Sequence, residues 1–100
     1  MQRGGSVYIL TTANRRVLYT GVTSDLIKRI PEHRMKFHPD SFTARYNCTM
    51  LVYYNHFPRI EEAILEEKRI KAGSREQKEQ LINNINYEWR DLWEDLMKDW

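Results

Sequence analysis

The sequence predicts an α+β fold: a small three-stranded sheet, mixed or antiparallel, flanked by helices in the order β-β-α-β-α-α-α. Two stretches rich in β-branched and aromatic residues lie close together near the N-terminus, and a third lies mid-chain. Helix start and stop signals mark the segments between and after them. The 100 residues suffice for one modest core, so we expect residues 1–100 to form a single domain.

The first two strands are expected at Val7–Thr11 and Val17–Val22. The polar stretch between them contains a turn-prone asparagine, Asn14, so the two strands should form a β-hairpin. Gly21 lies near the end of the second strand, where a glycine indicates either a close approach to the backbone or a bend.

A helix is expected next, from N-cap candidates at residues 23–25 to about Met35. Pro31 lies inside this helix and removes one backbone hydrogen bond at a cost of ~3 kcal/mol, so we expect a bend, not a helix end. Residues 38–47 are expected to form a loop. The third strand, Met50–Tyr54, is apolar enough to be central or covered on both faces.

Three helices are expected in the second half of the chain. Pro58 can open the first of them and Gly73 can close it. Ser74 and Gln77 form a capping-box pattern for the next helix. A C-terminal amphipathic helix is predicted because apolar residues recur there at helical spacing: Trp89, Leu92, Trp93, Leu96 and Met97.

The composition is that of a soluble globular chain, with 41% hydrophobic and 30% charged residues. No apolar run approaches the length of a membrane span, so no membrane association is expected. The first residues do not resemble a secretory signal, and Cys48 is the only cysteine, which excludes an internal disulfide. A cytoplasmic protein is therefore expected.

Positive charge is concentrated in the first half, although the net charge is only +2. Such a distribution is either ordinary unevenness of surface charge or a basic face for nucleic acid, and it slightly favours the second interpretation. Between Arg3 and Arg45 the acids are Asp25, Glu32 and Asp40, and the bases are Arg3, Arg15, Arg16, Lys28, Arg29, Arg34, Lys36 and Arg45.

One acid lies within the apolar face of the helix expected after Pro58. With Ile60 as zero and about 100° per residue, that face is centred at about −25°, and Glu67 falls at about −20°. Five other charged residues of the helix fall away from this face, and Leu65 is an apolar mismatch; the five are Glu61, Glu62, Glu66, Lys68 and Arg69. A carboxylate turned toward a core needs a cation, donors or a metal, so Glu67 is either a structurally paired acid or a metal ligand.

Arg29 and His33 are four residues apart on the first predicted helix and therefore share a face. Each has an ordinary interpretation, as a solvated cation and as a packing or capping histidine. Alternatively, the Arg29 guanidinium matches phosphate oxygens and would stabilise charge that develops on them. His33 would then exchange protons with the reacting oxygens.

Tyr8 and Tyr19 lie on the two strands of the predicted hairpin. Tyrosine is a common strand residue, which is explanation enough for either one alone. A phenol is a poor base at its usual pKa of about 10. It can accept a proton where hydrogen bonding, a nearby cation or a metal-activated water assists it.

The ordered set of tyrosine, Tyr-x-Gly, arginine, histidine and glutamate resembles the GIY-YIG nuclease superfamily, in its small single-domain bacterial branch. Two motifs correspond to the tripeptides that name the superfamily, Ser6-Val7-Tyr8 and Tyr19-Thr20-Gly21. The resemblance covers about residues 6–92, which we take as the core. The C-terminal part of the chain also resembles this branch, in three segments: Glu62-Ala63-Ile64-Leu65-Glu66-Glu67-Lys68-Arg69-Ile70-Lys71, Leu81-Ile82 and Asn86-x-x-Trp89-x-Asp91-Leu92.

The resemblance implies hydrolysis of phosphodiester bonds in DNA with one divalent metal, Mg²⁺ or Mn²⁺. Glu67 would hold the metal and Arg29 would stabilise the scissile phosphate. Tyr8 would help to activate the attacking water, Tyr19 would position the water or the phosphate, and His33 would assist proton transfer. Lys71 is a weaker candidate for contact with the phosphate backbone.

Departures from the family pattern include Ser6 in place of the first glycine and Pro31 inside the catalytic helix. Two alternatives to an endonuclease therefore stay open. One is a nucleic-acid-binding module that keeps the fold but cuts little, with binding that depends strongly on salt. The other is an interaction domain that binds a protein partner or a second copy through its C-terminal tryptophans, Trp89, Trp93 and Trp100.

Overall fold

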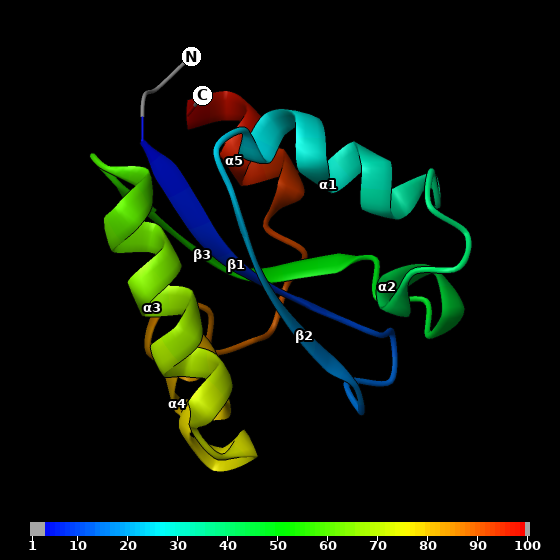
Figure 1. Cartoon of the computed structure of the whole chain (residues 1–100). Coiled ribbons are helices and arrows are strands. Elements are labelled where there is room, and N and C mark those ends of the chain that lie inside the picture. The colour runs from blue at the N-terminus through cyan, green and yellow to red at the C-terminus, as the bar shows by residue number, and fades with distance from the viewer. Residues whose placement is uncertain (1–3, 100) are drawn as a thin grey trace.

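The computed structural model describes residues 4–99 and has the predicted α+β fold (Figure 1). Three strands form one sheet: β1 (Gly5–Thr11), β2 (Leu18–Thr23) and β3 (Met50–Phe57). Both pairings are antiparallel and the strand order is β2-β1-β3. Of the two sheet types expected from the sequence, the sheet is therefore the antiparallel one, with β1 at its centre.

The helices in residues 4–99 are α1 (Leu26–Arg34), α2 (Phe42–Arg45), α3 (Ile60–Ala72), α4 (Arg75–Ile85) and α5 (Trp93–Asp99). The order differs from the prediction by α2, which lies where a loop was expected. The hydroxyl of Ser41 caps α2 by accepting from the backbone N–H of Ala44. A helix of four residues is too short to give a periodic pattern, which explains why the sequence does not predict it.

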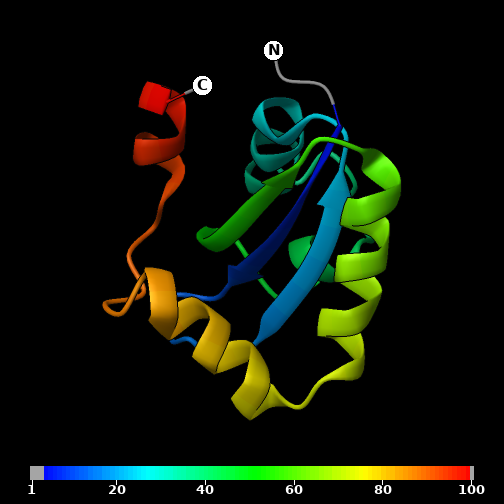
Figure 2. The same ribbon diagram turned by 90° about the vertical axis from the view of Figure 1, so that its left-hand side faces the viewer.

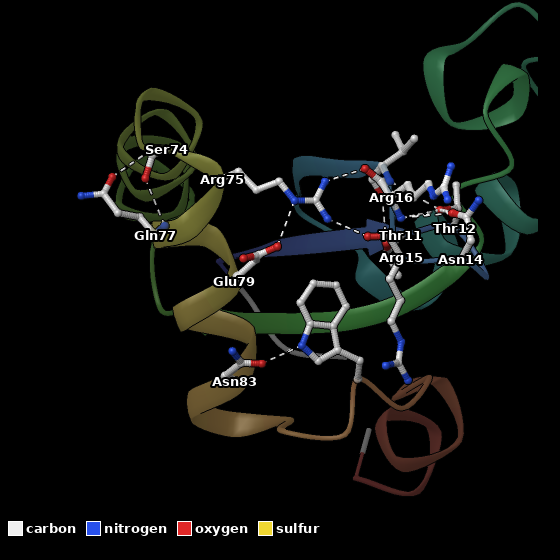
Figure 3. Close-up of polar contacts among 12 residues, drawn as sticks. Thr11, Thr12, Asn14, Arg15, Arg16, Ser74, Arg75, Gln77, Glu79 and Asn83 are labelled. Carbon is white, nitrogen blue, oxygen red and sulfur yellow. Dashed lines mark hydrogen bonds and ion pairs between the residues drawn. The ribbon is translucent and has the colours of Figure 1, made fainter.

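The turn between β1 and β2 is held from outside by α4. Figure 3 shows Arg75 reaching from α4 to the carbonyl oxygens of Arg15 and Arg16, at 2.6 and 2.5 Å. Glu79, one helical turn later, orients the guanidinium at 3.0 Å. Within the turn, the side chain of Asn14 accepts from the backbone N–H of Arg16. The hairpin predicted from the sequence is thus confirmed, and its turn is tied to a distant helix.

Helix α1 runs through its proline. The side chain of Asp25 caps the helix by accepting from the backbone N–H of Lys28. Beyond Pro31 the helix continues to Arg34, and the N–H of Met35 donates to the carbonyl of Pro31 at 2.9 Å. As predicted, the proline does not end the helix, so residues on either side of it stay on one continuous element.

The boundaries of α3 and α4 follow the predicted signals closely. Helix α3 begins two residues after Pro58, and Gly73 is its C-cap. Helix α4 carries the predicted capping box, in which Ser74 and Gln77 each accept from the other's backbone N–H.

Successive residues of β1 point to opposite faces of the sheet. Val7 and Ile9 pack on the side covered by α3 and α4, which we call the α3 face. Tyr8 and Leu10 pack on the side covered by α1 and α5, which we call the α1 face. All four side chains are at most 1% exposed. Figures 1 and 2 show the sheet between these two helical layers.

Strand β3 is an edge strand, yet both of its faces are covered. Leu51 belongs to the core of the α1 face, whereas Val52 and Tyr53 both belong to the core of the α3 face. Two consecutive residues share a face because the β1–β3 register shifts between Ile9 and Leu10, as in a β-bulge. Of the two positions predicted for this strand, central or covered on both faces, the structure has the second.

The prediction that the C-terminal helix includes Trp89 is wrong, because α5 begins at Trp93. Trp89 has a φ of 55°, in the left-handed region, which is incompatible with an α-helix. Its side chain is buried against the α3-face core, and its indole N–H donates to Asn83 at 2.6 Å. Of the apolar residues at helical spacing, those from Trp93 onward lie in α5, whereas Trp89 lies in the non-helical segment before it.

The tail motif seen in the sequence fastens the C-terminal segment to β3 and α1. The buried side-chain amide of Asn86 donates to the carbonyls of Val52 and Arg90 at 3.1 and 2.8 Å. The carboxylate of Asp91 accepts from Arg34 at 2.6 Å and from the backbone N–H of Leu51 at 3.3 Å. These bonds explain why the chain cannot continue as a helix from Trp89.

Two of the three tryptophans proposed for a partner surface pack on the cores of the sheet instead. Trp89 belongs to the core of one face, and Trp93 packs against the core of the other. Trp100 lies outside the described residues. Over residues 4–99, no helix combines the length and the apolar character that crossing a membrane requires.

Candidate active site

Tyr8 stands at the centre of the sheet on the α1 face, with its ring lying against Gly21 of β2. A methyl group added at Gly21 would come within 2.5 Å of both Cζ and the hydroxyl oxygen of Tyr8. Of the two reasons that the sequence offers for this glycine, the structure supports close approach. The Tyr-x-Gly motif therefore leaves room for the phenol on the neighbouring strand.

The phenol of Tyr8 begins a chain of hydrogen bonds across two helices. Its hydroxyl lies 2.9 Å from Nε2 of His33 on α1, and Nδ1 of the same imidazole lies 2.8 Å from the hydroxyl of Thr43 on α2. Thr43 is only 2% exposed, so this pairing is sheltered from water. The imidazole is thus held at both nitrogens.

Burial changes the acidity of both groups in opposite directions. It raises the pKa of Tyr8 to about 12; the charge of Tyr19 adds to this, and hydrogen bonding to Arg29 opposes it. It lowers the pKa of His33 to about 4, helped by the nearby positive charge of Arg29. Near neutral pH the site therefore holds a protonated phenol beside a neutral imidazole.

Arg29 lies one helical turn before His33, as the sequence predicts, and its side chain is 41% exposed. A hydrogen bond to Tyr8 raises the pKa of Arg29, so the guanidinium stays charged. It also pairs with Glu32 at 3.5 Å. Its Nε–H, in contrast, is buried and has no acceptor among residues 4–99.

Tyr19 lies beside these groups on β2. The centre of its ring is 6.3 Å from that of Tyr8 and 5.7 Å from that of His33. The structure thus brings four of the five predicted catalytic residues into one cluster on the α1 face. A cavity of about 440 Å³ opens beside this cluster, and its walls are Tyr19, Arg29, Glu32, His33, His38, Ser41, Phe42 and Thr43.

Glu67, the fifth predicted catalytic residue, is not part of this cluster and comes from the helix on the other face of the sheet. It lies on α3, which packs on β1 and β2, and its side chain is 12% exposed. Its carboxylate pairs with Nζ of Lys71 at 2.8 Å and is not part of the cavity wall. The negative charge of Glu67 nevertheless helps to raise the pKa of Tyr8, which links the carboxylate to the cluster electrostatically.

The helical wheel of α3 is only partly correct. Ala63 and Ile70 are buried and Glu67 is only 12% exposed, as expected of residues on the predicted face. Ile64, assigned to the apolar face, is 37% exposed. Glu66, assigned to solvent, is 21% exposed and pairs with Arg69. The face that α3 buries is therefore rotated away from Ile64 and toward Glu66.

The donor set around Glu67 suits a hard divalent cation that keeps most of its waters. Residues 4–99 contain no group of three or more His, Cys, Asp or Glu that could hold a metal together. One carboxylate plus water and phosphate oxygens is, however, a usual environment for Mg²⁺. The carboxylate already pairs with one cation, the ammonium of Lys71, whose side chain is 53% exposed.

Sequence reasoning missed the residues that α2 supplies. Thr43 orients His33, and Ser41 and Phe42 complete the cavity, but all three lie in the stretch expected to be a loop. The hydroxyl of Ser41 lies 3.3 Å from that of Thr43, and it also caps α2. The one available signal was Ser41 as an N-cap candidate, and a single serine is too common to be informative.

Comparisons with known proteins identify the family of this chain. The model of the GIY-YIG catalytic domain matches residues 4–80. A UPF0213 protein of Yersinia pestis (strain Pestoides F) is 32% identical over 76 residues, which are 76% of this chain and 78% of that protein. A UPF0213 protein of Yersinia pseudotuberculosis (serotype O:3, strain YPIII) matches to the same extent.

A solved structure matches as well. The solution NMR structure of a UPF0213 protein from Bacillus halodurans is 34% identical, with a TM-score of 0.54, and covers 85% of this chain and 90% of its own. The family model spans all five predicted catalytic positions, from Tyr8 to Glu67. This chain belongs to the GIY-YIG catalytic domain family, a family of nucleases that generally use divalent metal ions.

Proposed function

We propose that this protein is a divalent-metal-dependent endonuclease that hydrolyses phosphodiester bonds in DNA. The observation that carries the proposal is the hydrogen bond between Tyr8 and His33, with His33 and a charged Arg29 on the wall of an open cavity. A backbone phosphate bound at Arg29 would meet both a fixed positive charge and a route for protons. Those are the two things that attack by water on phosphorus requires.

The direction of the proton route follows from the donors present. Arg29 acts on the Tyr8 oxygen through its positive charge, and arginine has only donors, so Arg29 cannot accept the phenol proton. The phenol proton then needs an acceptor, and Nε2 of His33 lies 2.9 Å away. As the attacking water loses its proton toward the Tyr8 oxygen, the phenol proton passes to His33. Neither group has to carry a full negative charge.

Substrate binding favours this transfer. The positive charge of Arg29 is the second cause of the low pKa of His33, after burial. A phosphate bound at Arg29 neutralises that charge and so raises the basicity of the imidazole when it is needed. The new oxygen–phosphorus bond forms as the bond to the leaving oxygen breaks, and Arg29 stabilises the charge that develops on the phosphate oxygens.

The remaining residues bind and position. Tyr19, on the cavity wall, orients the phosphate or the water through its hydroxyl. Glu67 would hold the metal, Mg²⁺ or Mn²⁺, which supplies Lewis acidity and offsets negative charge on the reacting oxygens. Displaced from Glu67, the exposed ammonium of Lys71 is free to contact the DNA backbone.

The test is cleavage of single-stranded, duplex and branched DNA by the purified protein, with and without Mg²⁺ or Mn²⁺. Arg29→Ala and Glu67→Gln should each lower the cleavage rate at least about 100-fold, as removal of one charge-stabilising group does in other enzymes. Two matched controls should cut normally. Glu66→Gln changes the neighbouring acid on α3, and Arg75→Ala removes an arginine far from the cavity.

Two results would contradict the proposal. Salt-sensitive DNA binding with no metal-dependent cutting would leave a binding module of the same fold. Cutting that persists in Arg29→Ala and Glu67→Gln would place the chemistry elsewhere or in a contaminant. Melting temperatures equal to that of the unmodified protein would show that any loss of activity is local.

A further inference from the structure

Two aromatic side chains at the edge of the cavity contribute to neither core. Phe42 and Tyr46 are 45% and 50% exposed and belong to neither buried cluster of the sheet. They are four residues apart across α2, and the centres of their rings lie 4.7 Å apart at an interplanar angle of 38°. Burial therefore does not account for either of them.

This pair continues a row of rings that starts inside the site. Phe42 stacks on Tyr19, with the ring centres 5.9 Å apart and an interplanar angle of 27°. Tyr19 in turn lies against His33, and it shares the cavity wall with Arg29. The row thus leads from the proposed phosphate site, through Phe42, to Tyr46 at the surface.

We propose that Phe42 and Tyr46 form a stacking platform for an unpaired base of the strand whose phosphate is bound at Arg29. The inference rests on the proposed nuclease function and extends it to the substrate class. Aromatic faces bind bases of any sequence, at about 1–3 kcal/mol per base. A base inside a duplex has both faces covered by its neighbours, so the platform selects strands with unpaired nucleotides.

The charges around the platform favour this occupant over an apolar protein segment. Arg45 lies between the two rings in sequence and is exposed, and Lys36 is exposed and hydrogen-bonds to Asn47 at 2.6 Å. Arg45 is on the same short helix as Phe42 and next to Tyr46 in sequence, so an exposed cation accompanies the two rings. Aromatic faces and cations together suit bases joined by phosphates, whereas a partner helix needs a wide apolar groove.

The test measures binding with the full-length protein in a metal chelator, so that cutting does not interfere. The probe is a single strand of about 12 nucleotides, a length within the usual range for one small binding domain, with 2-aminopurine at its centre. The comparison probes are the same strand in a duplex and the same strand with abasic sites. Affinity is measured by anisotropy, and stacking by quenching of the 2-aminopurine.

Phe42→Ala and Tyr46→Ala should each weaken binding of the single strand about tenfold and reduce the quenching, while affinity for the duplex stays the same. Phe42→Trp, which keeps an aromatic ring, should retain the single-strand affinity and the quenching. Phe42→Leu, which keeps apolar bulk without a ring, should lose them. Tyr87→Ala is the matched control, because Tyr87 is 83% exposed but belongs to the segment after α4. It should bind like the unmodified protein.

The platform is wrong if Phe42→Ala changes single-strand and duplex binding equally, or if the abasic strand binds as tightly as the intact one. It is also wrong if Phe42→Leu retains the single-strand affinity, since bulk and not stacking would then be responsible. Failure of the nuclease proposal would look different. A protein that stacks bases through Phe42 but never cuts has the platform without the activity, and a protein that cuts regardless of Phe42 has the activity without the platform.

Discussion

The two faces of the sheet differ in the side chains that cover them. The α3 face is filled by apolar side chains such as Val7, Ile9 and Ile82, and its helix α4 also clamps the β1–β2 turn. On the α1 face the apolar core is interrupted at Tyr8, and an imidazole, a guanidinium and hydroxyl groups surround that phenol. Both faces have a buried apolar core, but only the α1 face also holds a cluster of hydrogen-bonded polar groups.

This difference matters because the polar groups would not stay together by themselves. The bond between Tyr8 and His33 joins residues 25 positions apart, and the α2 residues come from a helix of only four residues. Asp91 and Arg34 brace the far end of α1 against β3. The chemistry of the site therefore depends on packing and ties elsewhere in the fold.

The largest effect is expected from a core substitution on the α3 face. Ile82 is fully buried, so Ile82→Ala should lower the free energy of unfolding by about 2–5 kcal/mol through lost burial and a residual cavity. Denaturant titration measures this. Cleavage per folded molecule should not change, and a loss of activity in the folded fraction would break the division between the faces.

On the α1 face, Gly21→Ala should lower the cleavage rate more than it lowers the free energy of unfolding. Its added methyl group would press on the Tyr8 ring, and displacement of a catalytic group by about 1 Å costs roughly 100-fold in rate. Gly73→Ala is the control, since the methyl there would first meet the flexible end of Gln77, far from the cavity. Equal cleavage rates for the two variants would show that the position of Tyr8 is unimportant.

Thr43 should matter to the chemistry and not to the fold. Thr43→Val removes the hydroxyl beside Nδ1 of His33, so the imidazole loses the partner that holds its proton on that nitrogen. We expect about a tenfold fall in kcat with little change in KM, since general acid–base catalysis is weakened. ¹⁵N shifts of the imidazole should report a changed tautomer, and Thr43→Ser should restore both readouts. A normal tautomer in Thr43→Val would contradict the assignment.

A further effect concerns the pH dependence of stability. His33 should titrate at about 4 in the folded protein, below its value of about 6.5 in an unfolded chain. The unfolded state then binds the proton first, so the free energy of unfolding should fall as pH drops from about 6.5 to about 4 and then level off. Comparison with His33→Gln isolates this contribution. An identical pH dependence in both proteins would show that the imidazole is not buried as described.

Local patterns in the sequence predicted most of the fold. They failed where contacts between residues distant in sequence determine the backbone conformation. The hairpin, the capping box of α4 and the passage of α1 through Pro31 follow from neighbouring residues. Trp89 has the spacing of a helical residue, but hydrogen bonds of Asn86 and Asp91 to distant elements hold the segment in another shape. Such ties join residues about 30 to 60 positions apart and leave no periodic signal.

The site shows the same limit. The spacing of Arg29 and His33 predicts their shared face, and the helical wheel singles out Glu67. Resemblance to a family supplies the roles of the two tyrosines. None of these predicts Thr43 or Phe42, because their roles depend on how α2 packs against α1. The proposed stacking platform could therefore be found only from coordinates.

The central claim is that a cation held by Glu67 from α3 and the phenols of the α1 face form one site. Paramagnetic Mn²⁺ tests it directly, because it broadens the NMR signals of nearby nuclei without any requirement for cutting. We predict broadening of the Tyr8 and Tyr19 ring signals that disappears in Glu67→Gln and persists in Glu66→Gln. The claim would be contradicted if the ring signals of both tyrosines were not broadened, or if their broadening were unchanged in Glu67→Gln.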